Sequence, residues 1–416
     1  MARNWRTALG AALALGACTG AAPDGGGAGD GGGEAGADAA PGVATAVVGA
    51  DRAVLGGLTV PLDGSGSTGA SAYAWAQVSG PAVTLAGADQ PRAWAAVPED
   101  APAGTEYVFR LDVTGEVASD SAELTVSVIA AAFEDVLGGI DDTAELGSSE
   151  GIDFDGAGMW VVSTGGFVSR FDAAGAFQER IDVVGTPVGA NFADDGRLLI
   201  ARSDLGRVDA LDVGTGDLVT VASAVEGGGD LGTANYPLPA ADGSLFVTNR
   251  QGQKVFRAAG GEARVFLDGL GTNPNAIAFG PEPDVLYVGV VGAVYRVPIA
   301  ADGSAGEPSL YLDLGSDDGI TYEVDGLAFD EGQNLWVGCP NAETLFVAPY
   351  AASGSTTASR TWSAVNATHT YFVNIRHGRG TFGATAMSST NLGDRTVGRL
   401  ETGLGAMAAP LAVVRE

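Results

Sequence analysis

The fold of this chain follows from a stretch that reads Asp325-Gly326-Leu327-Ala328-Phe329-Asp330 and, after a short turn, Leu335-Trp336-Val337. A polar residue opens a short apolar strand, a turn rich in Asp, Glu, Gly and Asn follows, and a second apolar strand comes next. Five related copies of this unit begin at Glu150, Val188, Asn235, Asn275 and, more weakly, Phe372.

The spacing of the six copies predicts a β-propeller. Successive copies start 38, 47, 40, 50 and 47 residues apart, by subtraction of their first positions. A period of about 40–50 residues with two strands and a turn in each unit is typical of propeller blades. We therefore predict an all-β fold with a six-bladed propeller over residues 149–416. The first residue of each copy opens the inner strand of its blade, so these residues should form a ring around one end of the central channel.

The composition agrees with an all-β chain and argues against two classes of partner. Glycine accounts for 65 of the 416 residues and is spread between short apolar runs, as in proteins with many tight turns. The formal net charge is −30, with only 21 Lys and Arg residues. We therefore expect no large basic patch and no binding to nucleic acid or to an anionic membrane surface.

The first residues indicate export and lipid attachment. Arg3 and Arg6 precede the apolar stretch 7–17, which is too short to span a bilayer as a helix. The run 15–18, Leu-Gly-Ala-Cys, resembles the bacterial lipobox, which implies a signal peptide over residues 1–17 and lipid attached to Cys18. Thr19, in place of Asp, implies sorting to the outer membrane, where the lipid would anchor the protein to the bilayer. An ordinary cleaved signal with an incidental Cys18 is the alternative.

Three segments are expected between this signal and the repeats. Residues 18–42 are almost wholly Gly, Ala, Asp and Pro, which predicts a flexible tether. Residues 43–129 contain short strand-like runs separated by turn residues, which predicts a β-sandwich. This segment resembles the polycystic-kidney-disease (PKD) type of Ig-like domain in its runs 62–67, 73–81 and 107–113, with Trp75 as the core tryptophan. Residues 130–148 are expected to be a linker or a strand that closes the propeller.

Four of the six ring positions carry a side-chain oxygen. Glu150 and Asp325 offer carboxylates, and Asn235 and Asn275 offer amide oxygens. Such ligands suit a hard divalent cation, Ca²⁺ before Mg²⁺, and Zn²⁺ is less favoured because no His or Cys joins the set. Without a cation the two carboxylates would repel each other. The alternative is that the four are ordinary polar residues at a wet channel mouth.

The repeats resemble the senescence-marker protein/gluconolactonase family of six-bladed propellers. The resemblance rests on Ser149-Glu150-Gly151, on Asn235 with Gly243 eight residues later, and on the runs 274–279 and 325–330. It implies a metal-dependent hydrolase that acts on a lactone or a related ester.

The family also implies roles for individual residues. In that family the metal is held by residues that match Glu150, Asn275 and Asp325. The Asn that matches Asn235 contacts the substrate or a water on the metal.

This chain departs from the family pattern beside the ring. Ile152 and Val324 stand where the family usually has Pro, and Tyr236 stands where it usually has Asp. The basic residue that gluconolactonases place just before the third-blade Asn is missing, because Thr233 and Ala234 occupy that stretch. The neighbours that would specify a sugar-acid lactone are therefore absent.

If the ring is catalytic, metal-assisted hydrolysis is expected. The cation would polarise the substrate carbonyl and lower the pKa of a water molecule. Asp325 is the candidate general base, provided that one of its oxygens stays off the metal. His369 lies three residues before the sixth copy and is a candidate for the same mouth, although a lone His in such a segment is more often an exposed loop residue. His377 falls in a predicted turn at the opposite end.

Two other functions remain open from the sequence. One is a non-catalytic surface propeller of the NHL-repeat type that binds protein or glycan, with any metal structural. The apolar ring members Val188 and Phe372 favour it, whereas the four oxygen ligands favour a hydrolase. The other is a phosphotriesterase-like activity at the same ring.

Overall fold

The computed structural model describes residues 42–137, 145–317, 320–342, 344–350, 360–363, 371–391 and 396–408. Regular structure in these residues is β-strand, apart from two single-turn 3-10 helices, η1 (Pro340–Ala342) and η2 (Gly380–Phe382). The predicted all-β fold is confirmed. In the same residues we find no helix with the length and apolar character needed to cross a membrane.

The N-terminal part is a β-sandwich. Its first sheet has the order β1 (Arg52–Leu55), β7 (Asp120–Ile129), β6 (Glu106–Thr114) and β3 (Ala72–Ser79), and its second sheet the order β2 (Thr59–Asp63), β5 (Arg92–Ala96) and β4 (Thr84–Ala86). Strand β6 shows why the two sheets stack: every second side chain, from Tyr107 to Val113, is buried. Trp75 is 4% exposed and packs in this core, as predicted.

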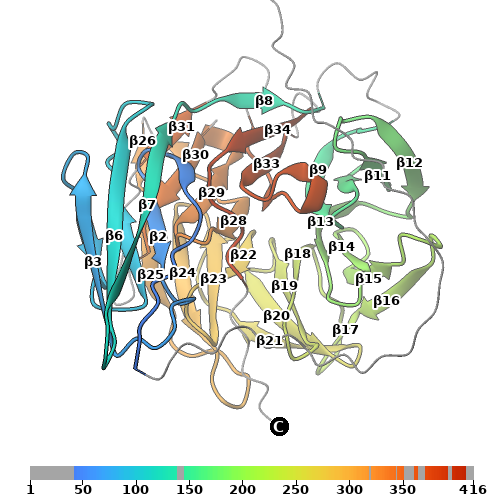
Figure 1. Cartoon of the computed structure of the whole chain (residues 1–416). Coiled ribbons are helices and arrows are strands. Elements are labelled where there is room, and N and C mark those ends of the chain that lie inside the picture. The colour runs from blue at the N-terminus through green and yellow to red at the C-terminus, as the bar shows by residue number, and fades with distance from the viewer. Residues whose placement is uncertain are drawn as a thin grey trace, which may run out of the picture.

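Six further sheets follow along the chain and surround a common centre (Figure 1). In chain order their strands are β9 (Ser149–Phe154), β10 (Met159–Ser163), β11 (Phe167–Phe171) and β12 (Phe177–Asp182); β13 (Pro187–Phe192), β14 (Leu198–Arg202), β15 (Arg207–Leu211) and β16 (Leu218–Ala222); β18 (Ala234–Pro239), β19 (Leu245–Asn249), β20 (Lys254–Ala259) and β21 (Glu262–Leu267), with β17 (Ala224–Val225) beside β21; β22 (Ile277–Phe279), β23 (Val285–Val290), β24 (Ala293–Pro298) and β25 (Ser309–Asp313); β28 (Gly326–Phe329), β29 (Leu335–Cys339), β30 (Thr344–Ala348) and β31 (Arg360–Ser363); and β32 (Ile375–His377), β33 (Ala386–Asn391) and β34 (Thr396–Glu401) with β8 (Phe133–Asp135). A two-stranded ladder, β26 (Ser316–Asp317) and β27 (Ile320–Thr321), precedes the fifth sheet. These sheets are blades 1 to 6 of a six-bladed propeller.

Strand β8 closes the propeller. It precedes blade 1 in the sequence but pairs antiparallel with β34 in blade 6, where Glu134 lies opposite Arg399. The Arg399 Nη2 also donates to the Glu134 Oε2 at 2.9 Å. Because the two ends of the array are joined in one sheet, neither end is left as an open edge (Figure 1).

Neighbouring blades approach closely just below the ring. A Cβ atom added to Gly151 would lie 2.5 Å from the Val188 carbonyl oxygen, and one added to Gly189 would lie 2.4 Å from that of Asn235. Only glycine fits at such separations. The glycine after a ring residue therefore lets the inner strand of the next blade pack closely against it.

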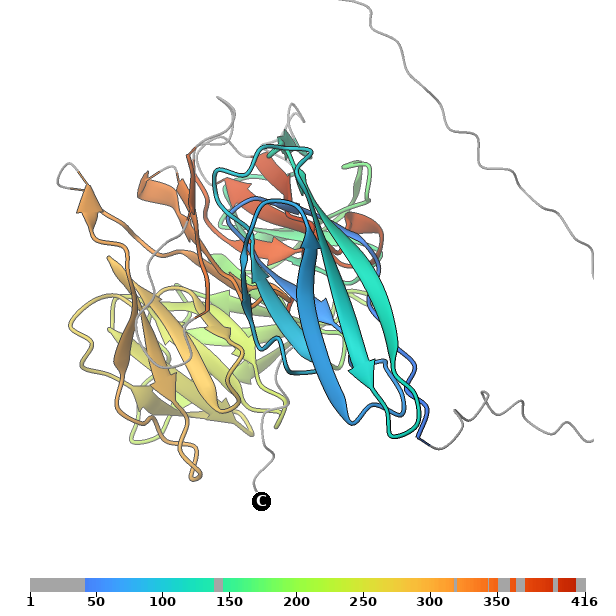
Figure 2. The same cartoon turned by 60° about the vertical axis from the view of Figure 1, so that its left-hand side comes forward.

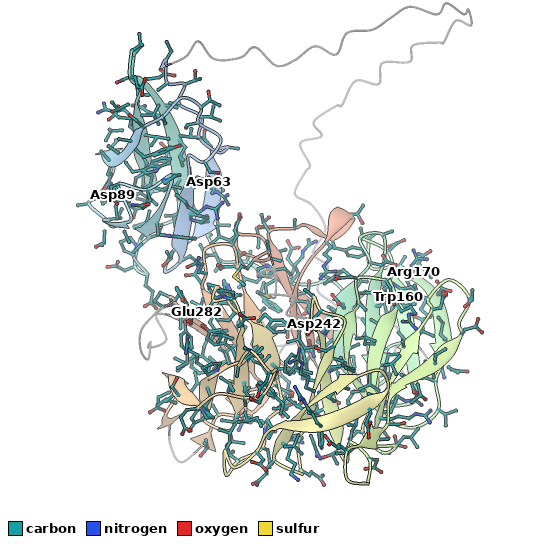
Figure 3. All side chains as sticks on the ribbon, turned by 90° about the horizontal axis from the view of Figure 1, so that it is seen from below. Asp63, Asp89, Trp160, Arg170, Asp242 and Glu282 are labelled. Carbon is teal, nitrogen blue, oxygen red and sulfur yellow. The ribbon has the colours of Figure 1, made fainter. Side chains whose placement is uncertain are left out.

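The hairpins formed by the first two strands of the blades are held by side chains around their turns. In blade 1 the Trp160 Nε1 donates to the Asp155 Oδ2 at 2.8 Å, and the Arg170 guanidinium lies 5.5 Å from the Trp160 ring centre (Figure 3). In blade 3 the Asp242 Oδ1 accepts from the Ser244 N–H at 2.9 Å. Asp-Gly pairs at these turns thus fix the hairpins and are separate from the ring.

The sandwich lies beside blades 5 and 6 and shares a core with them (Figure 2). One continuous hydrophobic cluster contains Leu55 and Val60 of the sandwich together with Trp336 and Leu404 of the propeller. The Leu55 N–H donates to the Thr402 carbonyl oxygen at 3.1 Å. The two domains therefore meet through buried apolar surface and a backbone hydrogen bond.

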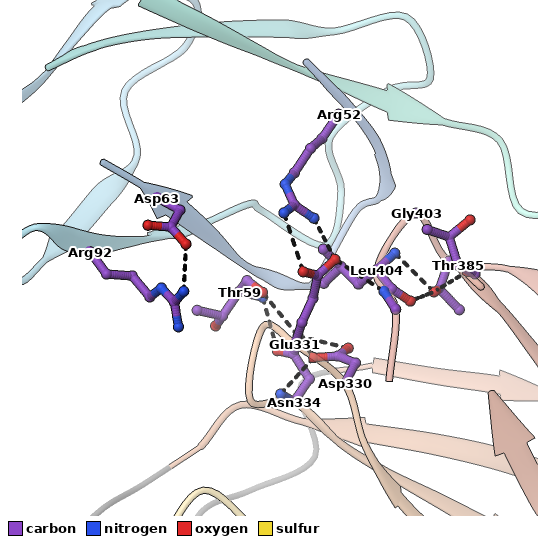
Figure 4. A network of polar contacts seen from close by, with 12 residues as sticks. Arg52, Thr59, Asp63, Arg92, Asp330, Glu331, Asn334, Thr385, Gly403 and Leu404 are labelled. Atoms are coloured by element: carbon purple, nitrogen blue, oxygen red, sulfur yellow. Dashed lines mark hydrogen bonds and ion pairs between the residues drawn. The ribbon is translucent and has the colours of Figure 1, made fainter. Parts of the chain in front are cut away.

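A polar network lies beside this shared core (Figure 4). The Asn334 Oδ1 accepts from the Thr59 N–H at 2.9 Å, and the Asn334 Nδ2 donates to the Thr59 carbonyl oxygen at 3.0 Å. The buried Asp330 carboxylate accepts from the Asn334 backbone at 3.0 Å and from the Trp336 Nε1 at 2.8 Å. Asn334 thus completes the hydrogen bonding of a sandwich strand from the propeller side.

His377 corrects one expectation of the sequence analysis. It is the last residue of β32 rather than a turn residue, and it is 5% exposed. Neither ring nitrogen has a hydrogen-bond partner among the described residues. Burial lowers the pKa of His377 to about 4, so the imidazole is neutral at physiological pH.

We predict that Asn334→Ala destabilises the protein by about 1–3 kcal/mol, because it leaves the half-buried Thr59 N–H and carbonyl without their hydrogen-bond partners. Urea denaturation followed by tryptophan fluorescence measures this loss. The control is Arg92→Gln, which breaks the exposed ion pair with Asp63 inside the sandwich (Figure 4) and should cost less than about 1 kcal/mol. Equal losses in the two variants would show that this network does not join the domains.

We also predict a specific acid sensitivity from His377. The unfolded chain takes up a proton near its ordinary pKa of 6.5 and the native protein only near 4, so the neutral imidazole stabilises the fold above pH 6.5 and this contribution is lost as the pH falls toward 4. The free energy of unfolding of the wild type should therefore fall by about 3 kcal/mol more than that of His377→Phe over this range. Urea denaturation at stepped pH checks this, and parallel pH curves for the two proteins would contradict it.

Candidate metal centre

The strand register places the four polar ring residues at equivalent positions in their blades. Glu150 lies two residues before Ile152, whose partner in the second strand is Val161. The same offset relates the other three to residues that likewise pair with a valine of the second strand: Asn235 to Pro237, Asn275 to Ile277, and Asp325 to Leu327. The predicted alignment of these four residues thus agrees with the backbone pairing.

The sixth ring position is Val373, and the assignment of Phe372 from the sequence is wrong by one residue. Val373 lies two residues before Ile375, which pairs with Ser389. Phe372 packs in the core shared with the sandwich, where its ring meets that of Phe133 edge-on at 5.5 Å. The sixth copy is the weakest of the six, and a slip of one residue reverses the direction of the side chain.

Asn275 and Asp325 are in direct contact. The Asn275 Nδ2 donates to the Asp325 Oδ1 at 2.5 Å. The amide must present its nitrogen here, because an ionised carboxylate can only accept. The Asn275 Oδ1 is therefore turned elsewhere, and this buried oxygen has no hydrogen-bond partner among the described residues. Such an oxygen costs about 1–3 kcal/mol unless it gains a partner.

The two ring carboxyl groups are held in an environment that disfavours negative charge. Burial raises the pKa of Glu150, and the nearby charge of Asp325 raises it further. Burial also raises the pKa of Asp325. The positive charge of Arg250 acts against both increases but does not cancel them. Both side chains keep part of their surface open, so they line the channel, where a cation would relieve their charge.

These residues fit a hard divalent cation. Where the structure describes the chain, it shows no group of three or more His, Cys, Asp and Glu residues suited to a metal, so amide oxygens would have to complete the set. Glu150, Asn275 and Asp325 would supply oxygens of the kind that Ca²⁺ and Mg²⁺ prefer, and Asn235 stands beside them in the ring. Zn²⁺ fits less well because nitrogen and sulfur ligands are lacking from the set.

Arg376 reaches across the channel below the ring, a contact that the sequence pattern does not predict. Its Nη2 donates to the Asn191 Oδ1 in blade 2 at 2.9 Å, and its guanidinium lies 5.0 Å from the ring centre of Tyr236 in blade 3. Blades 6 and 3 face each other in a six-bladed ring, so this side chain crosses the channel. It separates the ring from the opposite end.

The structure also brings a basic residue to the ring. Arg250 follows β19, which pairs antiparallel with the strand that carries Asn235. Its guanidinium forms an ion pair with Glu323. The basic residue expected just before Asn235 is missing from the sequence, whereas Arg250 reaches the ring from the end of the second strand. His369 and Cys18 lie outside the described residues, so their roles stay predictions.

Comparison with protein families gives two matches. A model of the SMP-30/gluconolactonase/LRE-like region matches residues 149–375, which are 227 of the 416 residues. A model of a PKD domain matches residues 48–128. A search of curated proteins gave no match.

Several solved structures share the fold. A protein described as a putative gluconolactonase is 17% identical with a TM-score of 0.55, over 67% of this chain and 94% of the other. A gluconolactonase from Xanthomonas campestris is 16% identical with a TM-score of 0.52, over 65% and 90%. The calcium-binding protein regucalcin from Agrobacterium tumefaciens is 17% identical with a TM-score of 0.50, over 64% and 94%. At these identities the likeness concerns the fold.

The family match covers more than half of the chain and includes all four polar ring residues. It begins at the first strand of blade 1 and ends in β32 of blade 6. The predicted resemblance is thereby confirmed, and the chain belongs to the SMP-30/gluconolactonase/LRE-like family, with a PKD domain ahead of its propeller.

Proposed function

We propose that the propeller binds Ca²⁺ at its ring and hydrolyses a lactone or an ester there. The observation that carries the proposal is the Asn275 Oδ1, a buried oxygen without a partner among the described residues, beside two carboxyl groups whose pKa values are raised. Membership of the family supports a lactonase-like or calcium-binding propeller. The solved structures that are similar to this chain include a gluconolactonase and a calcium-binding protein.

The chain's own residues would divide the work. A bound cation would polarise the substrate carbonyl and lower the pKa of a water molecule. The Asn275 Nδ2 donates to the Asp325 Oδ1 and so fixes the carboxylate. The Asp325 Oδ2 is then the atom that could take a proton. Asn235, which is 8% exposed, would donate a hydrogen bond to a substrate oxygen. Arg376 blocks the far end of the channel, so substrate and water would enter from the ring side.

The first test replaces both ring carboxylates, Glu150→Gln with Asp325→Asn. This change removes the negative charge that attracts the cation, so Ca²⁺ content should fall to less than about a tenth and added Ca²⁺ should no longer raise the Tm. For the wild type, Ca²⁺ at about 100 times its Kd should add about 2.7 kcal/mol. Elemental analysis and thermal denaturation give the two readouts.

The matched control changes two outer acids, Glu179→Gln with Asp195→Asn, which pair with arginines on the blade surface. It should keep the Ca²⁺ content and the Tm response. If the ring variant keeps them as well, the site is not at the ring. Ca²⁺ binding without turnover on a panel of lactones and aryl esters would favour the non-catalytic binding propeller instead.

We further propose that a lipid on Cys18 anchors the protein to the outer membrane of a bacterial cell. The support is the run 15–18, Leu-Gly-Ala-Cys, behind a basic start and an apolar stretch. Cys18→Ser should move the protein from the membrane fraction to the soluble fraction and abolish its labelling by radioactive palmitate. A variant that remains in the membrane fraction would contradict the anchor.

A further inference from the structure

Arg250 stands at the mouth of the ring. Strand β19 runs antiparallel to β18 and ends with Asn249 opposite Ala234, the neighbour of Asn235. The Arg250 N–H donates to the Thr233 carbonyl oxygen at 3.1 Å, which fixes its backbone to the segment that leads into the ring. Burial raises the pKa of both Glu150 and Asp325, and the positive charge of Arg250 is close enough to oppose this increase in both.

The ion pair with Glu323 holds this arginine across two blades. Glu323 lies two residues before Asp325, in the segment that enters blade 5, whereas Arg250 belongs to blade 3. The Glu323 N–H donates to the Asn341 Oδ1 at 2.8 Å, so the acid is itself held in place. The pair therefore spans blade 4, the blade that contributes Asn275 to the ring.

The guanidinium keeps a donor that has no partner among the described residues. Arginine has five N–H donors, and the hydrogen bond to Glu323 uses the Nη2. The Arg250 Nε is buried and has no hydrogen-bond partner among the described residues, and 40% of the side chain remains exposed. An arginine whose only role was a surface ion pair would not need to lie beside the two ring carboxyl groups. It would also not need to keep a guanidinium donor without a partner.

A negatively charged ligand group can be held at Arg250 through its open donors. A divalent cation would offset the charges of Glu150 and Asp325, so these carboxylates would not repel such a group. Glu323 offsets the charge of Arg250 but binds only one side of the guanidinium, which leaves donors for a ligand carboxylate. Guanidinium groups bind carboxylates with strong, directional hydrogen bonds.

We propose that Arg250, oriented by Glu323, selects substrates that carry a free carboxylate a few carbon atoms away from the lactone or ester carbonyl. This inference rests on the proposed hydrolase function and gives it a substrate class, acidic lactones or esters. Arg250 would be a specificity-determining residue, since the carboxylate that it binds does not react.

Binding of a simple dicarboxylate tests the inference without any turnover. Calorimetry with glutarate and with its neutral diamide is carried out on the full-length protein loaded with Ca²⁺. Arg250→Gln should weaken glutarate binding tenfold or more, about 1.4 kcal/mol, and leave the diamide unchanged. Arg180→Gln, which removes an outer ion-paired arginine of β12, should bind both as the wild type does. Equal glutarate affinity in Arg250→Gln and wild type would overturn the proposal.

Kinetics with paired esters separate this inference from the proposed function. For Arg250→Gln, the KM of para-nitrophenyl hydrogen glutarate should rise at least tenfold while that of the neutral para-nitrophenyl valerate stays the same. Turnover that falls equally on both esters in Arg250→Gln would refute selection by charge but keep the hydrolase. If no ester is hydrolysed by the wild type, the hydrolase fails, and the glutarate measurement still decides whether Arg250 binds carboxylates.

Discussion

The pairing of β8 with β34 is the interaction on which the site depends. Each blade contacts mainly its neighbours, so an array of six would have two free ends if nothing joined them. Strand β8, which comes before blade 1, completes the sheet of blade 6 and turns the array into a closed ring. Closure brings Glu150 near Asp325, which is 175 residues later in the chain by subtraction, and the effect of Asp325 on the pKa of Glu150 reflects this proximity.

The ring holds its polar groups at a cost that the rest of the fold must offset. Two carboxyl groups with raised pKa values, together with an amide oxygen that lacks a partner among the described residues, are unfavourable in a protein interior. The blades supply buried apolar surface, and the sandwich adds to it through the shared core that contains Leu55 and Trp336. Carboxyl groups with raised pKa values and polar atoms without hydrogen-bond partners, when they lie at a channel mouth, are typical of ligand-binding sites. The stability of the blades therefore permits the unfavourable arrangement at the ring.

Local patterns were sufficient to predict the fold and the four polar ring residues, because each copy carries its own strand, turn and strand. The sixth copy was misaligned by one residue, since its inner strand is short and Val373 and Phe372 are both apolar. Arg250 and Arg376 could not be found in this way. Arg376 acts on residues two and three blades away, and Arg250 becomes a neighbour of Glu150 only after the propeller closes. Contacts made across the channel leave no periodic signal in the sequence.

The sandwich is also connected to the ring, through the hairpin of β28 and β29 in blade 5. Asp325 directly precedes β28, and Asp330 directly follows it, so the two acids stand at opposite ends of one inner strand. At the end of β28 that faces the sandwich, Asp330 and Asn334 are hydrogen-bonded to each other, and Asn334 is hydrogen-bonded to Thr59 of the sandwich. At the inner end, Asp325 is fixed by Asn275. A strand held at both ends cannot slide along the axis without breaking one set of bonds. The sandwich therefore helps to fix the position of the blade that supplies the candidate base, in addition to any role as a spacer.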